Sequence, residues 1–542
     1  MKRRVLLSLG LIGFAVWAMV QAPAPGPGLA AFMPQGPLLF VEAQDFGALV
    51  RDWNASREKT LWLASSNYSV FQQSRLYQRL TDAQNEFAAA AGLPPDMALV
   101  ESVAGSESAL AIYDTGNLHF LYITKLASAR ALETALWKTR SSHETRNAAG
   151  IPYFLRVDPA SRRVAAFASA QDYLLLATRE DLIAGALTLL AGRPAAALTG
   201  ERWYAEGVRA AGTRGEVRMV MNMPSLLRTP YFRSYWIQRN VSALRQFDSG
   251  VADLHRSVDE YREDRVFLRL ERPGEQMAGG GAPVSGILKL VPPGVGFYSA
   301  WANPGAQAVL SLLRAKILAP GPGVPPLSEN APGVVVSGVA GTEADLETRI
   351  DEPPLGSAAP EPVPAAVRRL IEANPAAAAL EVAGTRVAPG GVFVAIDTAI
   401  VLVGARDWDA NAVHAAFANI PEAGPPGRLA FETSGKVLIV SNSADLAGKI
   451  LSARESAAPA APADPCYSAT FAHKDEHARF VKMMRLIDHV QTPAGGMENA
   501  PPFFSGNIAS LSTTLARADS VEVVSRDTGP EVFETVTYRL KQ

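Results

Sequence analysis

Two stretches of this chain resemble each other closely enough to suggest that its fold is duplicated. Residues 166–187, AFASAQDYLLLATREDLIAGAL, align without a gap with residues 430–451, AFETSGKVLIVSNSADLAGKIL, and six of the 22 positions are identical. In each stretch a short apolar run, 173–177 or 437–441, is too brief for a helix and suits a buried strand. The pattern predicts that each strand leads directly into a helix.

A polar residue follows each of these predicted strands. Thr178 and Asn442 each stand three residues before an acid, Asp181 and Asp445. This spacing is close to a capping box, in which a side-chain oxygen accepts a hydrogen bond from a free amide and an early acid complements the helix dipole. Thr178 and Asn442 are therefore predicted to cap the two helices.

Two further pairs of stretches occur in the same order along the chain. PQGPLLFVEAQDFGA resembles PPGVGFYSAWANPGA, and RVFLRL resembles TVTYRL, with the aligned pairs Gly36 and Gly294, Asp45 and Asn303, Gly47 and Gly305, and Leu270 and Leu540. Collinear matches of this kind indicate two copies. The sequence thus predicts an α+β chain of two homologous halves, each with antiparallel sheets covered on one side by helices. The expected core order is strand, strand, helix, strand, strand, helix.

The domain plan follows from length and composition. A chain of 542 residues is long enough for at least two domains. The stretch GEQMAGGGAPVSG is flexible by composition and makes the best boundary. The expected segments are a signal peptide or anchor (1–22), a Pro/Gly/Ala linker (23–33), a first repeat domain (34–273), a Gly-rich linker (274–285) and a second repeat domain (286–542).

Turn residues predict where the first hairpin of each half lies. In the first half, 110–113 and 118–123 flank the turn sequence Asp-Thr-Gly-Asn. In the second half, 392–396 and 400–403 are the expected strands. A last hairpin is predicted around Asp527 to Pro530, where another Asp-Thr-Gly turn occurs.

The amino terminus has the pattern of an export signal or a membrane anchor. Lys2, Arg3 and Arg4 precede the largely apolar run 5–20, and Pro23 follows directly after a possible cleavage site. Proline at that position favours an uncleaved anchor over a cleaved signal peptide. The positive-inside rule places the rest of the chain outside the cytoplasm, anchored in the inner membrane or, if cleaved, periplasmic.

Charge, cysteine content and motifs exclude several function classes. The 51 basic and 53 acidic side chains give no overall field that would favour nucleic acid. Cys466 is the only cysteine, so no disulfide forms within the chain. The sequence has no phosphate-binding loop, dinucleotide fingerprint, nucleophile elbow or paired Cys-x-x-Cys. No cofactor is therefore expected, and the protein is not expected to be an enzyme.

One motif supports a catalytic alternative. His473, Glu476 and His477 fit the H-x-x-E-H pattern of inverted zinc peptidases. On a helix the two histidines would share a face and could hold zinc while the glutamate activated water. A third zinc ligand is not evident nearby. The favoured interpretation is therefore that these residues form a solvated first turn of a helix and bind no metal.

An aromatic segment is the candidate contact surface. It contains Tyr231, Phe232, Tyr235 and Trp236 among several arginines. Exposed, these residues would form a patch for a partner or a membrane surface. Buried, Phe232 and Trp236 would be a core stripe at helical spacing, which is the favoured interpretation.

The stretches PLLFVEAQDFGAL, RLYQRL and GNLHFLYITKLASARALETAL resemble large uncharacterised extracytoplasmic bacterial proteins of a domain-of-unknown-function family. The resemblance covers mainly the first half. It implies an exported α/β repeat protein and brings no catalytic residues. The function hypothesis is a non-catalytic binding or assembly protein of the cell envelope, with an envelope protein or a ligand as partner. The alternative is a metal-dependent hydrolase that uses residues 473–477.

Overall fold

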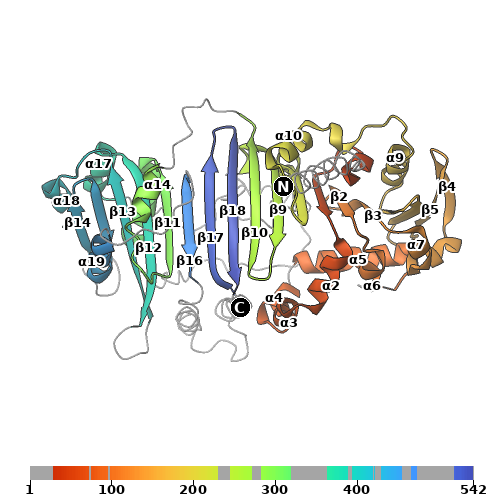
Figure 1. The fold of residues 1–542 in the computed structure, drawn as a ribbon, viewed down its shortest axis with the longest axis horizontal. Helices are drawn as coiled ribbons and strands as arrows, with labels where there is room; N and C mark the ends of the chain where they lie inside the picture. Colours follow the sequence, from red (N-terminus) through yellow and green to blue (C-terminus); the bar gives the residue numbers. More distant parts are fainter. Residues whose placement is uncertain are drawn as a thin grey trace, which may run out of the picture.

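A single antiparallel sheet runs through the computed structural model of this chain (Figure 1). The structure describes residues 28–72, 75–94, 98–229, 244–271, 282–318, 363–387, 394–418, 420, 429–453, 465–472 and 518–540. Within them the sheet has 18 strands. From one edge to the other these are β4 (Glu144–Ala148), β5 (Ile151–Val157), β6 (Val164–Ala170), β7 (Tyr173–Ala177), β3 (His119–Lys125), β2 (Ser108–Asp114), β1 (Leu39–Ala43), β8 (Val217–Asn222), β9 (Phe247–Arg256), β10 (Glu260–Arg269), β18 (Glu531–Leu540), β17 (Ala518–Asp527), β16 (Tyr467–Phe471), β11 (Phe297–Ala302), β12 (Ala376–Val387), β13 (Val394–Gly404), β15 (Val437–Ser441) and β14 (Ala430–Ser434).

The strand order is the same in the first half, 28–271, and the second half, 282–540. Outward from β10 come β9, β8, β1, β2, β3, β7 and β6. Outward from β18 come β17, β16, β11, β12, β13, β15 and β14. The second half therefore has the predicted order of strand, strand, helix, strand, strand, helix. The first half has two more strands, β4 and β5. In this region the sequence predicts strands at 153–157 and 173–177, which are β5 and β7, and it misses β4 and β6.

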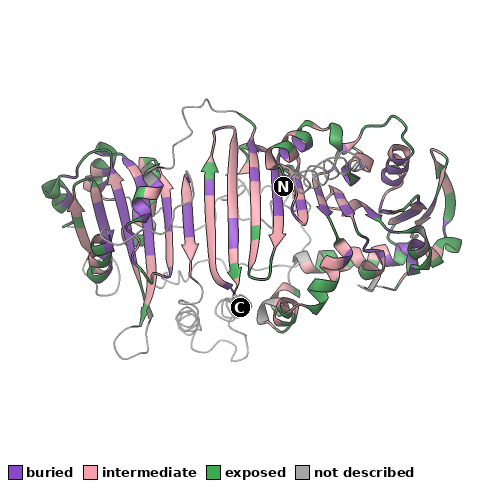
Figure 2. Ribbon diagram, viewed as in Figure 1, coloured by how far each residue is buried: buried purple, intermediate pink, exposed green. Residues whose placement is uncertain are grey.

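The halves share one sheet, so the prediction that each has its own sheets is wrong. Strand β10 pairs antiparallel with β18 along their whole length. At the centre of this pairing, Thr535 donates a hydrogen bond of 2.9 Å to Asp264. Arg265 and Glu534, the next pair, form an ion pair of 2.7 Å. Figure 2 shows that these central strands are mostly half-buried, whereas the strands further out contain most of the buried residues.

Helices cover both faces of the sheet rather than one. On the first face lie α2 (Phe46–Ala55), α5 (Arg75–Ala91), α6 (Ala98–Val103), α7 (Ser128–Glu133), α8 (Ala135–Lys138), α15 (Ala306–Leu313), α17 (Ala365–Ala373) and α18 (Ala410–Phe417). On the second face lie the short helix η1 (Leu29–Phe32), α9 (Glu180–Leu190), α10 (Arg202–Ala211), α14 (Ala282–Leu288) and α19 (Ala444–Ala453). The one-sided prediction was wrong because strands such as β7 are apolar at consecutive positions and so bury both faces.

The strands predicted at 173–177 and 437–441 are present as β7 and β15 with those bounds. Thr178 and Asn442, however, do not cap the following helices. The Thr178 hydroxyl accepts a hydrogen bond from the amide of Phe120 in β3, and the Asn442 side-chain oxygen accepts one from the amide of Thr398 in β13. These side-chain oxygens therefore bond to the neighbouring strand instead of accepting from a free amide at the helix start.

The first hairpin of the second half was also predicted wrongly. Its strands are β12 and β13, so 392–396 and 400–403 belong largely to one long strand. Asp397 lies within that strand, where its carboxylate pairs with Arg386 of β12 at 2.9 Å. The alanine run that begins β12 has weak strand propensity, but Ala378 and Ala379 are buried between helices on opposite faces. Small side chains let those helices approach the sheet.

Residues at the end of each expected linker are packed into a hydrophobic core. Leu29 and Met33 are buried in the core of the first half, although they lie in the segment 23–33. Val284, in the segment 274–285, is fully buried in α14. None of the described helices combines the length and hydropathy needed to cross a membrane, and the amino-terminal segment 1–22 lies outside the described residues.

Candidate functional site: an apolar cavity in the first half

A cavity of about 810 Å³ lies between the sheet of the first half and the helices α2, α5 and α6. Its lining is mostly aliphatic and aromatic, and comprises Val41, Ala43, Phe46, Leu49, Trp53, Leu80, Ala83, Gln84, Phe87, Leu99, Val100, Val103, Ser108, Ala109, Leu110, Ile112, Asn117, Leu118, Phe120, Tyr122, Arg163, Val164, Leu176, Thr178, Val217, Leu254 and Arg256. This volume lies within the roughly 300–1,000 Å³ of small-molecule sites.

The floor of the cavity is one face of three neighbouring strands. Val41 of β1 pairs with Leu110 of β2, which pairs with Tyr122 of β3. Because alternate residues of a strand share a face, this cross-strand row lies on one face of the sheet. The opposite face carries Phe40 and Ala111, which pack against α9 and α10 in the core.

The hydroxyl groups of the floor are satisfied within the protein. Ser108 and Thr124 are hydrogen-bonded at 2.6 Å, and Tyr122 donates to the Val103 carbonyl at 2.9 Å. Burial raises the pKa of the Tyr122 hydroxyl, so it stays protonated and acts as a donor. These groups give the cavity no reactive centre.

Helix α2 forms part of the roof of the cavity, and local contacts explain where it begins. Asp45 caps α2 by accepting a hydrogen bond from the Ala48 amide at 2.8 Å. From there Phe46, Leu49 and Trp53, spaced by three and four residues, place one apolar stripe of α2 over the cavity. The Gly47 amide donates to the Gly105 carbonyl at 3.0 Å, which fixes the start of α2 against the loop before β2.

The cavity opens where its apolar lining reaches the surface. Trp53 of α2 is 48% exposed and Leu80 of α5 is 47% exposed, yet both line the cavity. The gap between α2 and α5 is therefore the mouth.

An arginine lies at each end of the cavity and is bound to a carboxylate. Arg163 pairs with Glu86 of α5 at 2.6 Å. Arg256, at the end of β9, pairs with Glu216 at 2.8 Å and with Asp52 of α2 at 3.3 Å. Two of these bonds, those to Glu86 and Asp52, tie roof helices to the sheet.

The second half has polar side chains at the corresponding place. Ser299 of β11 pairs with Glu381 of β12, as Val41 pairs with Leu110 in the first half. Glu381 is buried and forms an ion pair of 2.8 Å with Lys316. The apolar cavity is thus a property of the residues of the first half and does not follow from the strand order alone.

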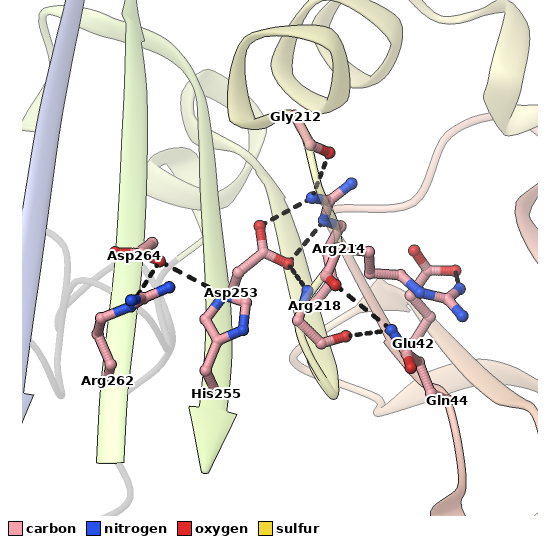
Figure 3. Close-up of polar contacts among 10 residues, drawn as sticks. Glu42, Gln44, Gly212, Arg214, Arg218, Asp253, His255, Arg262 and Asp264 are labelled. Carbon is pink, nitrogen blue, oxygen red and sulfur yellow. Dashed lines mark hydrogen bonds and ion pairs between the residues drawn. The ribbon is translucent and has the colours of Figure 1, made fainter. Parts of the chain in front are cut away.

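A buried polar cluster lies on the opposite face of the same strands (Figure 3). Arg218 of β8 donates two hydrogen bonds, of 2.9 and 2.8 Å, to Asp253 of β9. Arg218 also donates to the Gly212 carbonyl at 3.0 Å, and Asp253 accepts from the Gly215 amide at 2.9 Å. Because every charge here is satisfied by a neighbour, the cluster holds the loop after α10 in place.

Glu42 extends this cluster onto β1. Its carboxylate pairs with Arg214 at 2.9 Å. Burial raises the pKa of Glu42, and the nearby Arg214 opposes that effect only in part. On the far side of the cluster, His255 and Arg262 contact Asp264 at 3.4 and 3.1 Å on a more exposed surface (Figure 3).

The candidate site residues from the sequence lie outside the described residues. This holds for His473, Glu476 and His477 and for Tyr231, Phe232, Tyr235 and Trp236. Within the residues that the structure does describe, no three His, Cys, Asp or Glu side chains group closely enough to hold a metal ion. The cavity was missed because each lining residue fits an ordinary core pattern, and the gap between the layers has no local signal.

Comparisons with known proteins add little. No known protein family matches the chain, and no curated protein matches it. Crystal form I of TP0453 is 9% identical, with a TM-score of 0.26, and the match covers 45% of this chain and 79% of that chain. Form III is 10% identical, with a TM-score of 0.24, and covers 46% and 81%. Likenesses this weak carry no argument about the present chain.

Proposed function

We propose that this protein is a non-catalytic binding protein of the cell envelope whose ligand is an apolar molecule held in the cavity under α2, α5 and α6. The observation that carries the proposal is the lining, which is almost wholly apolar and reaches the surface at Trp53 and Leu80. Filling such a space with hydrocarbon stabilises a complex by about 0.8 kcal/mol for each buried methylene.

The polar second half supports a specific role for the cavity. If the space were a by-product of the strand order, the matching position under α15 would be expected to be apolar too. Instead Glu381 and Lys316 form an ion pair there.

Photolabelling tests the proposal on the full-length chain. The probe is a long-chain alcohol with a diazirine in its chain, and labelled peptides are mapped by mass spectrometry. Labels are expected on the lining peptides of β1, β2 and α5. Ala83→Trp, which fills the cavity from α5, should lower that labelling at least about tenfold, since burial of a chain is worth several kcal/mol.

The control is Ala89→Trp on the same helix, because Ala89 is exposed and does not line the cavity. It should label like the unmodified protein. Absence of labelling on the lining peptides, or equal labelling of the two variants, would reject apolar binding at this site.

We also propose that the halves arose by duplication. The shared strand order supports duplication. Two equivalent contacts also support it: Thr178 accepts a hydrogen bond from Phe120, and Asn442 accepts one from Thr398. Helices α9 and α19, which carry Asp181 and Asp445, follow equivalent strands. An experimental structure in which Thr178 and Asn442 contacted strands at different places in the two orders would contradict this.

The location is a third proposal, and it rests on the basic residues and apolar run at the amino terminus. The protein is expected to stay with the membrane fraction after a high-salt wash. Recovery as a processed periplasmic protein would reject the anchor and retain export.

A further inference from the structure

We infer that the ligand of the cavity is an uncharged long-chain molecule, such as an alcohol or an ester, rather than an ionised fatty acid. The inference rests on the proposed function and concerns the charge of the ligand. It follows from how the charged groups around the cavity are paired.

The basic groups that line the cavity are already neutralised. Arg163 is bound to Glu86 at 2.6 Å. Arg256 is bound to both Glu216 and Asp52. Together, Arg163 and Arg256 therefore provide two guanidinium groups that are paired with three carboxylates. Next to the lining residue Thr178, Arg179 is paired with Asp181 at 2.6 Å. A ligand carboxylate would therefore find no unbalanced positive charge among the lining residues.

Burying an ionised carboxylate without an opposite charge costs far more free energy than burying a neutral hydroxyl that forms a hydrogen bond. At the mouth, the ligand head would lie near Trp53 and Leu80, and Asp52 precedes Trp53 on α2. A negative head left at the mouth would thus lie close to Asp52, one of the three carboxylates that already outnumber the two guanidinium groups.

A neutral polar group is available instead. The Gln84 side chain lines the cavity on α5 beside Ala83, and the hydrogen bonds of the described residues do not include it. An amide both donates and accepts without net charge, so it suits a hydroxyl or an ester.

The test compares two diazirine probes of equal chain length, the alcohol and the carboxylic acid, on the full-length protein at about pH 7. The alcohol should label the lining peptides at a concentration at least about tenfold lower than the acid. Lowering the pH toward the ordinary carboxyl pKa of about 4 should bring the acid close to the alcohol, since protonation removes the charge.

A variant gives a second, independent readout. Glu86→Gln releases Arg163 from its carboxylate, so acid labelling should improve at least about tenfold relative to alcohol labelling. Glu522→Gln is the control, because Glu522 pairs with Arg539 at 3.0 Å and neither residue lines the cavity. It should leave the ratio unchanged.

The outcomes separate the two proposals. Labelling by the acid at an equal or lower concentration than the alcohol would overturn this inference while apolar binding stands. An unchanged acid-to-alcohol ratio in Glu86→Gln would also overturn it, because the pairing of Arg163 would then not control ligand charge. Failure of both probes to label the lining peptides would reject the proposed function itself.

Discussion

Removing Arg218 should strongly destabilise the first half, because its partner Asp253 would remain as a buried charge. Both side chains are 3% exposed. In Arg218→Leu the Asp253 carboxylate keeps only the Gly215 amide as a donor, at 2.9 Å. Breaking a buried pair by removing one partner costs about 3–5 kcal/mol. Since urea slopes are about 1–3 kcal/mol per molar, the unfolding midpoint should fall by roughly 1 M or more.

The assay is urea unfolding followed by tryptophan fluorescence, with Arg262→Leu as the matched control. Arg262 pairs with Asp264 at 3.1 Å, but their side chains are 46% and 36% exposed. Such a pair contributes about 1 kcal/mol or less, because water screens it. The double variant Arg218→Leu with Asp253→Leu removes the stranded charge, so it should cost less than the sum of the two single variants.

Two results would refute this reasoning. The first is an Arg218→Leu variant that unfolds at the same midpoint as Arg262→Leu. The second is a double variant whose cost equals the sum, which would mean that the two side chains do not stabilise each other across β8 and β9.

Two further predictions follow from single positions. Gly105→Ala should destabilise by about 1–3 kcal/mol in the same assay, because a Cβ there would lie 2.2 Å from the Lys125 carbonyl oxygen; Gly448→Ala, in open space on α19, should be neutral or stabilising, and equal effects would contradict the packing argument. Because burial raises the pKa of Glu42, the folded state holds that proton more tightly than the unfolded state, and this contribution is lost as pH rises above the usual 4.5. Glu42→Gln should therefore gain stability relative to the unmodified protein as the pH rises above 4.5, and a relative loss on raising the pH in urea unfolding would contradict the direction of the pKa shift.

The sequence predicted strands well where apolar runs have clear boundaries. Strands β7 and β15 end directly before Thr178 and Asn442, and these polar residues mark the edge of the buried run. It failed at β12, because alanine signals no strand, and at Asp397, which resembles a turn residue until its partner Arg386 is known. Both errors have the same cause, since the deciding contact comes from another element.

The cavity could not be predicted for a related reason. Leu110 and Phe87 look like ordinary core residues, and the sequence says nothing of the distance between the layers that carry them. That distance depends on contacts such as the Gly47 to Gly105 hydrogen bond and the Asp52 to Arg256 ion pair. Only the assembled helices and strands define the empty volume.

The strand pairing at the centre of the sheet shows that the alignment of the last strands of the two halves is off by one residue. The alignment of RVFLRL with TVTYRL places Phe267 against Thr537. In the structure, Leu39 and Phe297, which the alignment makes equivalent, pair with Met221 and Phe471. Met221 pairs with Gly250 and Phe471 with Val521. Gly250 in turn pairs with Phe267 and Val521 with Tyr538, so Phe267 corresponds to Tyr538. Because side chains alternate, a slip of one residue would reverse the faces of the whole strand.

With this register, Asp264 corresponds to Thr535, and these two residues are hydrogen-bonded to each other at the centre of the β10 and β18 pairing. Under the proposed duplication, equivalent strands therefore meet antiparallel at equivalent positions, which is the self-complementary geometry of a two-fold interface. Each copy covers the open edge strand of the other, and unpaired edges promote aggregation. This gives a physical reason for one continuous sheet in place of two.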